Sequence, residues 1–123
     1  MASLIIASGA REGDYYPLTD QTVVVGRDAK CPIQIVDDER ISRVHLQINL
    51  DPAEGGFCAE DLKSANGVVV NNARINGRIR LGNGDLIIIG DTKLVFFDRD
   101  FPDRKSAWDY YKIAGERGRP TMM

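Results

Sequence analysis

The 123-residue sequence has few of the side chains that build metal centres or covalent cross-links: one histidine and two cysteines. These are too few for a tetrahedral zinc site with the usual ligand sets, and we expect no metal and no other cofactor. Cys31 and Cys58 allow at most one disulfide, which is not the pattern of a disulfide-stapled secreted domain. We therefore interpret both as reduced thiols in a cytoplasmic protein.

The sequence also lacks a large excess of charge of either sign, and it lacks long apolar runs. The chain carries 16 Lys and Arg against 18 Asp and Glu, so it lacks the basic excess of a general nucleic-acid binder. Apolar runs such as residues 86–89 are far too short to span a bilayer, and no basic residue precedes the brief apolar stretch at the start. We expect neither a nucleic-acid nor a membrane partner, and the oligomeric state stays open.

The signatures of common enzymes are absent as well. A Ser-His-Asp triad would have to use His45, and Ser42 lies three positions before it, but there is no Gly-x-Ser-x-Gly nucleophile elbow. Residues 82–84 begin like a dinucleotide fingerprint, but Ile87 stands where the third glycine belongs, and no phosphate-binding Gly-Lys-Ser or Gly-Lys-Thr run occurs. We expect no catalytic residue.

The pattern that is present is an alternation of period two. Positions 44–50 alternate apolar and polar residues, which predicts a half-buried strand whose apolar face carries Val44, Leu46, Ile48 and Leu50. Shorter β-branched or aromatic runs predict further strands at residues 4–7, 15–19, 22–25, 33–35, 67–70, 86–89 and 93–97.

Turn signals separate these strands. Three Asn-Gly pairs, which begin at Asn66, Asn76 and Asn83, favour tight reversals, and residues 51–56 read as a longer polar loop. No long helix fits before about residue 103. Many short strands joined by glycine-rich turns predict an all-β sandwich.

The last segment has a different pattern. Ser106 and Asp109 match a capping box, and Trp108 and Tyr111 fall on one helical face, which predicts a short helix over residues 106–115 packed on the sandwich.

We accordingly divide the chain into a β-sandwich domain, residues 1–100, and a C-terminal helical extension with its tail, residues 101–123. The alternative is that everything after Pro102 is linker or tail.

Five motifs follow one another in the expected loops: Gly26-Arg27, Ser42-x-x-His45, Asp61-x-x-Ser64-x-Asn66-Gly67, Val70-Asn71-Asn72 and Leu81-x-x-Gly84-Asp85-x-Ile87-x-Ile89-Gly90. Each motif is weak by itself, but five in this order with strands between them are specific. The series resembles the forkhead-associated (FHA) family of phosphothreonine-binding modules, over roughly residues 22–97.

The resemblance implies an FHA-like β-sandwich of about eleven strands, with the ligand site on loops at one end and the chain ends at the opposite face. It implies a non-catalytic module that binds phosphothreonine peptides and acts as an adaptor for partners phosphorylated by Ser/Thr kinases.

The same resemblance assigns roles to residues by position. Arg27 and Ser42 would contact the phosphate, Arg43 would support or contact it, and Asn66 would hold the peptide backbone. The residues that would shape the loops are Gly26, His45, Gly67 and Asn71.

The chemistry of these side chains agrees with that assignment. A phosphothreonine carries about 1.5 to 2 negative charges and three acceptor oxygens. The planar guanidinium of Arg27 can donate two parallel N–H bonds to it, and the Ser42 hydroxyl can add a third. Asn66 has both a donor and an acceptor, so it can pair with a peptide backbone.

The sequence departs from the family pattern at Ala65, where members often carry a Thr or Ser hydroxyl that contacts the phosphate. Lys63 or Ser64 would have to compensate, Lys63 by charge alone. Asn72 replaces a glycine and Val68 a threonine; the first change is mild because Asn tolerates left-handed backbone. The missing hydroxyl bears on affinity more than on fold.

Less specific interpretations stay open for each residue. Arg27 could form an ordinary surface ion pair with Asp28 or Asp37, and Ser42 and Asn66 could serve only in turns.

His45 alternates with Val44 and Leu46, which predicts that it points away from the apolar face. We interpret it as a structural histidine that bridges two loops rather than as a general base. The alternative for the whole chain is an FHA-like structural or protein-interaction domain in which phosphate recognition is weak or absent.

Overall fold

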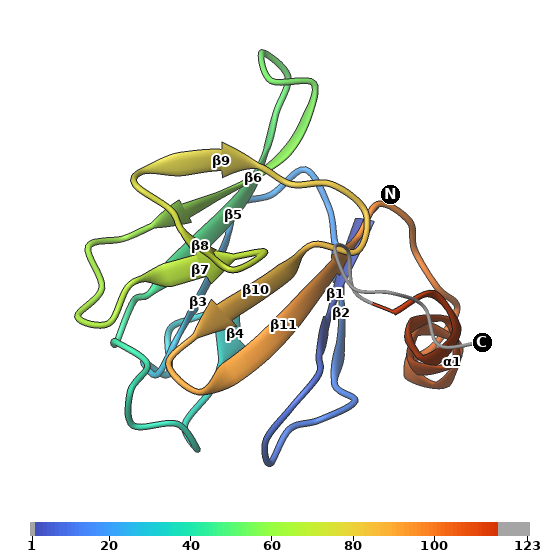
Figure 1. Ribbon diagram of the computed structural model, residues 1–123, viewed down its shortest axis with the longest axis horizontal. Helices are drawn as coiled ribbons and strands as arrows, with labels where there is room; N and C mark the ends of the chain where they lie inside the picture. The colour runs from blue at the N-terminus through green and yellow to red at the C-terminus, as the bar shows by residue number, and fades with distance from the viewer. Residues whose placement is uncertain (1, 116–123) are drawn as a thin grey trace.

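Two β-sheets pack face to face in the computed structural model, which describes residues 2–115 (Figure 1). The first sheet has the order β2 (Tyr15–Leu18), β1 (Ala2–Ile6), β11 (Thr92–Phe97), β10 (Leu86–Ile89), β7 (Val68–Val70), β8 (Ala73–Arg74). The second has the order β4 (Ile33–Gln34), β3 (Val23–Gly26), β5 (Leu46–Asp51), β6 (Gly56–Asp61), β9 (Arg78–Arg80). Helix α1 (Arg104–Ala114) follows, so the expected sandwich of eleven strands with a C-terminal helix is confirmed for the described residues.

The core lies between the sheets because alternate residues of each strand face inward. The first sheet contributes Leu4, Ile6, Ile87, Ile89, Leu94 and Phe96. The second contributes Val25, Ile33, Leu46, Ile48, Phe57 and Ala59. Each large apolar side chain buried in this way stabilises the fold by about 1.5 to 3 kcal/mol.

The outer face of the first sheet is apolar near β1 and β11, and α1 covers it. Ile5, Val95 and Phe97 point away from the core and pack with Ala107, which is fully buried on the helix. Figure 1 shows α1 beside β1 and β2, on the opposite side of the sandwich from the loops that join β3, β4 and β5. The helix therefore supports the sheet without approaching those loops.

The helix begins two residues earlier than the sequence suggested. Its N-cap is Asp103, in extended backbone, whose carboxylate accepts a hydrogen bond from the Ser106 amide at 2.8 Å. Ser106 is thus the third residue of the first turn rather than the cap. The helix ends at Gly115, whose amide donates to the Tyr111 carbonyl at a φ of 71°. Its half-buried aromatic residues, Trp108, Tyr110 and Tyr111, pack against the outer apolar cluster.

The strand expected at residues 44–50 starts only at Leu46, and two side-chain orientations were therefore wrong. Val44, expected on the apolar face, is 49% exposed. His45, expected to point away from that face, is completely buried. The alternation fails here because the two residues precede the regular β5–β6 ladder, which begins at the pair Leu46 and Asp61.

Three strands were not expected from the sequence. The polar segment 51–56 forms the turn of a hairpin, closed by a bond from the Glu54 amide to the Asp51 carbonyl, and β6 follows it. Strands β8 and β9 are exposed along their whole length, so they show no apolar alternation. Their pairing is determined by backbone hydrogen bonds to β7 and β6.

Cys31 and Cys58 are free, buried thiols. Burial raises the pKa of both, and the charges of Asp28 and Asp51 add to the effect on Cys31 and Cys58 respectively.

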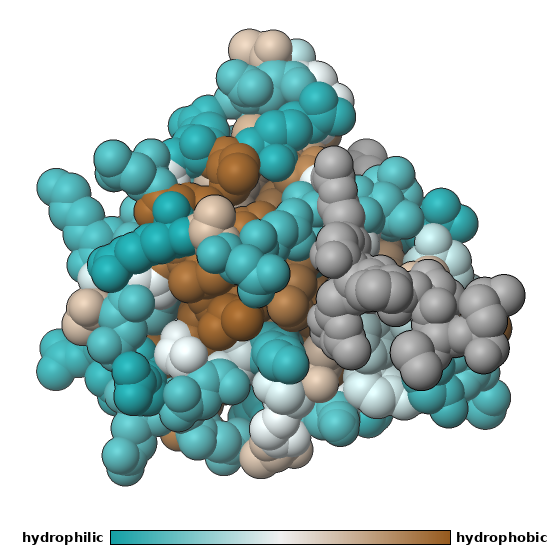
Figure 2. All heavy atoms as spheres, viewed as in Figure 1, coloured by the Kyte–Doolittle hydropathy of each residue, from teal (hydrophilic) through white to brown (hydrophobic). Residues whose placement is uncertain are grey.

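Between residues 2 and 115, no helix combines the length and apolar character needed to cross a bilayer. Figure 2 shows apolar side chains gathered over β7 and β10 within a largely hydrophilic surface.

Candidate functional site

The end of β3 runs very close to the segment that precedes β5. A Cβ on Gly26 would lie only 2.1 Å from the Arg43 carbonyl oxygen, so no other residue fits there without moving the backbone. The Arg27 amide donates to the Ser42 carbonyl at 3.1 Å, and the Asp28 amide donates to the Arg43 carbonyl at 3.1 Å. Gly26 thus allows the Arg27 backbone to lie directly against Ser42 and Arg43.

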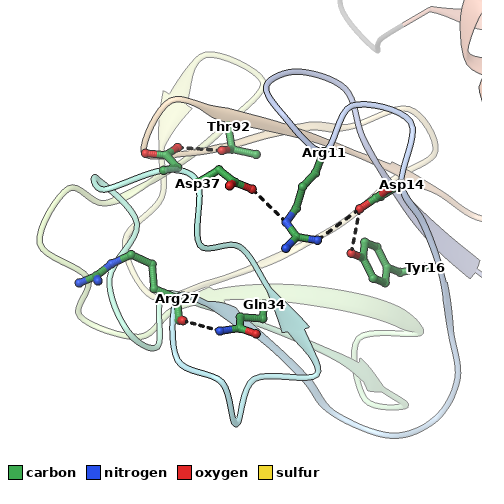
Figure 3. Close-up of polar contacts among 8 residues, drawn as sticks. Arg11, Asp14, Tyr16, Arg27, Gln34, Asp37 and Thr92 are labelled. Carbon is green, nitrogen blue, oxygen red and sulfur yellow. Dashed lines mark hydrogen bonds and ion pairs between the residues drawn. The ribbon is translucent and has the colours of Figure 1, made fainter.

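The guanidinium of Arg27 is held at its inner end and exposed at its outer end. Its Nε donates to the Ile41 carbonyl. Figure 3 shows the guanidinium turned away from the group formed by Arg11, Asp14 and Asp37. Asp37 pairs with Arg11 at 3.2 Å, and in the described part of the chain no carboxylate lies within ion-pairing distance of Arg27. The Nη nitrogens form no ion pair within residues 2–115.

Ser42 lies at the junction of two loops. Its hydroxyl oxygen accepts a hydrogen bond from the Ala65 amide at 3.0 Å. This bond uses an oxygen lone pair, so the hydroxyl proton can still be donated. The neighbouring Arg43 is exposed.

His45 lies beneath both loops. Its Nδ1 accepts from the Ser42 amide at 2.9 Å, and its Nε2 is 2.7 Å from the Gly67 carbonyl oxygen. An amide can only donate and a carbonyl can only accept, so the ring proton is on Nε2. Both nitrogens are used within the fold, which gives His45 a bridging position and not that of a base facing a ligand.

The β6–β7 loop is braced by its own side chains. The Ser64 hydroxyl donates to Asp61 at 2.7 Å and accepts from the Gly67 amide at 2.9 Å. Its proton is therefore already engaged, in contrast to that of Ser42. Lys63 is exposed, with a φ of 58°.

Asn66 is exposed on the same loop and is tied to the β4–β5 loop. Its Nδ2 donates to the Arg40 carbonyl at 2.8 Å. This bond leaves the second N–H and the oxygen of the Asn66 side-chain amide unused.

Asn71 lies at the other end of β7. Its Nδ2 donates to Asp85 at 2.9 Å, and its Oδ1 accepts from the Leu86 amide at 3.0 Å. The left-handed φ of 50° suits an Asn at this turn. Asn71 therefore joins the β7–β8 turn to β10, away from the loops that carry Arg27 and Ser42.

Three residues beside these loops were missed by the sequence analysis. Arg40 supplies the carbonyl that holds Asn66. Arg74 lays its guanidinium over Gly67, where an added Cβ would meet its Nε at 2.6 Å. With Lys63 it borders a surface hollow of about 540 Å³. No motif marks these residues, because strand β8 and the two loops meet only in the folded chain.

The third missed residue is Asp38, a buried carboxylate. It accepts hydrogen bonds from the Arg40 amide at 3.0 Å, the Asp91 amide at 2.7 Å and the Thr92 hydroxyl at 2.7 Å. Burial raises the pKa of this carboxyl, but the hydrogen bonds from Thr92, Asp91 and Arg40 outweigh it, so the pKa lies below its ordinary value. Asp38 connects the β4–β5 loop to the β10–β11 turn.

The structure thus brings the exposed Arg27, Arg43 and Asn66 and the half-buried Ser42 to neighbouring loops, with Gly26, His45 and Gly67 below them. A guanidinium and a hydroxyl proton are donor groups that suit an anion, and a side-chain amide suits a peptide backbone. Within residues 2–115, no three His, Cys, Asp or Glu side chains are grouped as a metal site.

The family comparison gives one clear match: the model of the FHA domain covers residues 23–90. The chain belongs to the FHA domain family. This FHA domain is 32% identical, over 98% of its length, to an FHA domain-containing protein of Arabidopsis thaliana. It spans only 32% of that relative, so the comparison concerns one part of a larger protein.

Solved FHA domains have the same fold. The solution structure of an Arabidopsis thaliana FHA domain matches with a TM-score of 0.73 at 32% identity, covering 83% of this chain and 88% of that one. The MEK1 FHA domain, crystallised with a HOP1 phosphothreonine peptide, matches with a TM-score of 0.66 at 27% identity, covering 80% of this chain and 97% of that one.

Proposed function

We propose that this FHA domain is a non-catalytic reader of phosphothreonine peptides. The observation that carries the proposal is the exposed Arg27 guanidinium, held at Nε and unpaired at its Nη nitrogens, on a loop bonded to Ser42. The MEK1 domain with its phosphothreonine peptide supports the same ligand class.

Arg27 donates two parallel N–H bonds to two phosphate oxygens, and Ser42 donates its hydroxyl proton to an oxygen. The amide of Ala65 holds the Ser42 oxygen from behind, which orients that proton before the ligand arrives. Arg43 and Lys63 add positive charge from the rims of the two loops.

Asn66 pairs with the backbone of the peptide next to the phosphothreonine. Its remaining N–H and its amide oxygen match the C=O and N–H of an extended chain. Because the bond to Arg40 fixes its side chain, little rotamer freedom is lost on binding. Phosphate contacts thus provide affinity, and Asn66 orients the peptide.

Ser64 takes a different part from that of Ser42. Its hydroxyl donates a hydrogen bond to Asp61 and accepts one from the Gly67 amide. Ser64 therefore stabilises the loop and does not replace the hydroxyl absent at Ala65. The phosphate is therefore held by fewer hydroxyl groups than in members that carry Thr or Ser there.

We further propose that the domain acts as an adaptor that recruits threonine-phosphorylated partners in the cytoplasm, in keeping with its two free cysteines. In this proposal residues 1–100 supply the binding domain and residues 101–123 an extension.

The test is an oriented library of peptides with a fixed phosphothreonine, compared with the same library carrying threonine. We expect retention of the phosphorylated library only, and micromolar affinity for the selected peptides, about −7 to −8 kcal/mol. Equal retention of both libraries would contradict phosphate reading and favour an FHA-like interaction domain that uses another surface.

A further inference from the structure

The loops that carry Arg27 and Asn66 are both held by the same short stretch of backbone. The Arg40 carbonyl accepts a hydrogen bond from the side-chain amide of Asn66, and the Ile41 carbonyl accepts one from Nε of Arg27. The next carbonyl, that of Ser42, accepts from the Arg27 amide. Three successive carbonyls of segment 40–42 thus determine where the two exposed side chains lie.

This stretch is in turn attached to Asp38. The Asp38 carboxylate accepts a hydrogen bond from the Arg40 amide at 3.0 Å, and the backbone carbonyl of Asp38 accepts one from the Ile41 amide at 3.2 Å. Asp38 therefore holds the peptide unit 39–40 through its carboxylate and the unit 40–41 through its backbone carbonyl. The carbonyl of unit 40–41 holds Asn66, and the carbonyl of the next unit along the chain holds Arg27.

Asp38 is itself fixed by the opposite sheet. Its carboxylate accepts from the Asp91 amide and the Thr92 hydroxyl, both at 2.7 Å. Asp38 as a whole residue is only 8% exposed, so these bonds are shielded from water.

The fit around this carboxylate is tight. A Cβ on Gly90 would lie 2.8 Å from the Asp38 carboxylate, and Gly90 has a φ of 57°. Gly90 is the last residue of the last sequence motif. A glycine is needed there because the turn must leave room for the Asp38 carboxylate.

We propose that Asp38 is a positioning residue for phosphopeptide binding. It contacts no ligand, but it anchors segment 40–42 to β11 and so preorganises Arg27 and Asn66. The inference rests on the proposed function. When Asp38 is altered, only a fraction of the molecules holds the loops in the binding arrangement, and the apparent affinity falls by that fraction.

The central variant is Asp38→Asn, which keeps the size of the side chain but places an amide NH₂ among three donors. Asp85→Asn is the matched control. Asp85 is also a buried carboxylate that braces a turn, at the Gly82 amide and Asn71, but it lies at the other end of β10.

Affinity is measured with a fluorescent phosphothreonine peptide taken from the library, at a temperature where each variant is fully folded by circular dichroism. We expect Asp38→Asn to bind about 5- to 20-fold more weakly and Asp85→Asn to stay within about twofold of the parent. Equal binding by Asp38→Asn, or an equal loss in Asp85→Asn at a similar loss of stability, would overturn the proposal.

Hydrogen exchange provides a second readout that does not need a ligand. In free Asp38→Asn, amides of residues 40–42 and 65–67 should exchange faster than in the parent, while those of β10 and β11 should not. Saturating phosphopeptide should restore much of the protection. Unchanged loop exchange would contradict anchoring by Asp38 even if the domain bound no phosphopeptide at all.

Thr92→Val keeps the test valid if Asp38→Asn does not fold, since it removes one of the three donors. We expect it to bind about two- to threefold more weakly, and unchanged affinity would overturn the proposal. The two ideas fail differently. If the parent binds phosphorylated and unphosphorylated peptide equally, the proposed function is refuted. If the parent binds only the phosphorylated peptide and the variants bind it equally well, only the role of Asp38 is refuted.

Discussion

The Ser42 amide donates a hydrogen bond to Nδ1 of His45 over 2.9 Å, and this bond links the residue expected to meet the phosphate to a fully buried ring. Through Nε2 the same ring reaches the Gly67 carbonyl, next to Asn66. Two loops that are far apart in sequence thereby keep a fixed separation.

His45→Ala should destabilise the domain and weaken phosphopeptide binding together. The variant leaves the half-buried Ser42 amide and the buried Gly67 carbonyl without partners, which we expect to cost about 2 to 4 kcal/mol of unfolding free energy. Urea denaturation and anisotropy with the selected peptide measure the two effects. His45→Asn, whose side-chain oxygen can accept from Ser42, should recover part of both; no recovery would argue against the Ser42 bond as the main contribution.

Arg27→Ala should abolish most phosphate-dependent affinity. It removes a bidentate charged pair, which corresponds to about 2 to 4 kcal/mol of binding free energy. Arg27→Lys should recover little, because an ammonium keeps the charge but loses the planar fork. Titration calorimetry with phosphorylated and unphosphorylated peptide checks both, and an Arg27→Ala variant that binds like the parent would refute this role.

Ala65→Thr should tighten binding. The Ser64 hydroxyl is engaged by Asp61 and the Gly67 amide, so the added hydroxyl would supply a phosphate donor that the parent lacks. We expect a gain of about 1 kcal/mol, below the roughly 1.5 to 3 kcal/mol of a hydrogen bond to a charged group, because the site is exposed to water. Ala65→Val has the same shape without the hydroxyl and should not gain; equal gains in the two variants would point to packing instead.

The stability of the domain should fall in acid partly through Asp38. Its pKa is lower in the folded chain than the ordinary 3.8, so its contribution is complete above about pH 5 and is lost as the pH falls through the folded value. Thermal melts at about every pH unit between pH 6 and pH 2 should show the melting temperatures of the parent and Asp38→Asn converging at the acid end. A constant difference in melting temperature would contradict this linkage.

Trp108→Ala should lower the unfolding free energy by about 1 to 2 kcal/mol and leave phosphopeptide affinity unchanged. Trp108 is half-buried, packs against Tyr111 at 5.3 Å between ring centres, and lies on the helix remote from the ligand loops. Ile113→Ala on the same helix is the control, because Ile113 is 75% exposed and its loss should matter little. A melt unchanged by Trp108→Ala would show that its packing contributes no stability.

Period-two apolar patterns and turn residues were enough to predict the sandwich, since burial of one strand face leaves a direct record in the sequence. The order of the loop motifs likewise pointed to the FHA family and to Arg27, Ser42 and Asn66. Where burial does not alternate, the prediction failed: β8 and β9 are exposed throughout, and Val44 lies just before its ladder begins.

The tertiary structure alone decided how the site is held together. Asp38 meets Thr92 across 54 positions of sequence, and His45 meets Gly67 across 22. A carboxylate in an acidic stretch and an imidazole beside a valine look like exposed residues in the sequence, because their partners come from other strands. Hydrogen-bond partners of buried polar groups are determined by the packing of the two sheets, and no local pattern encodes them.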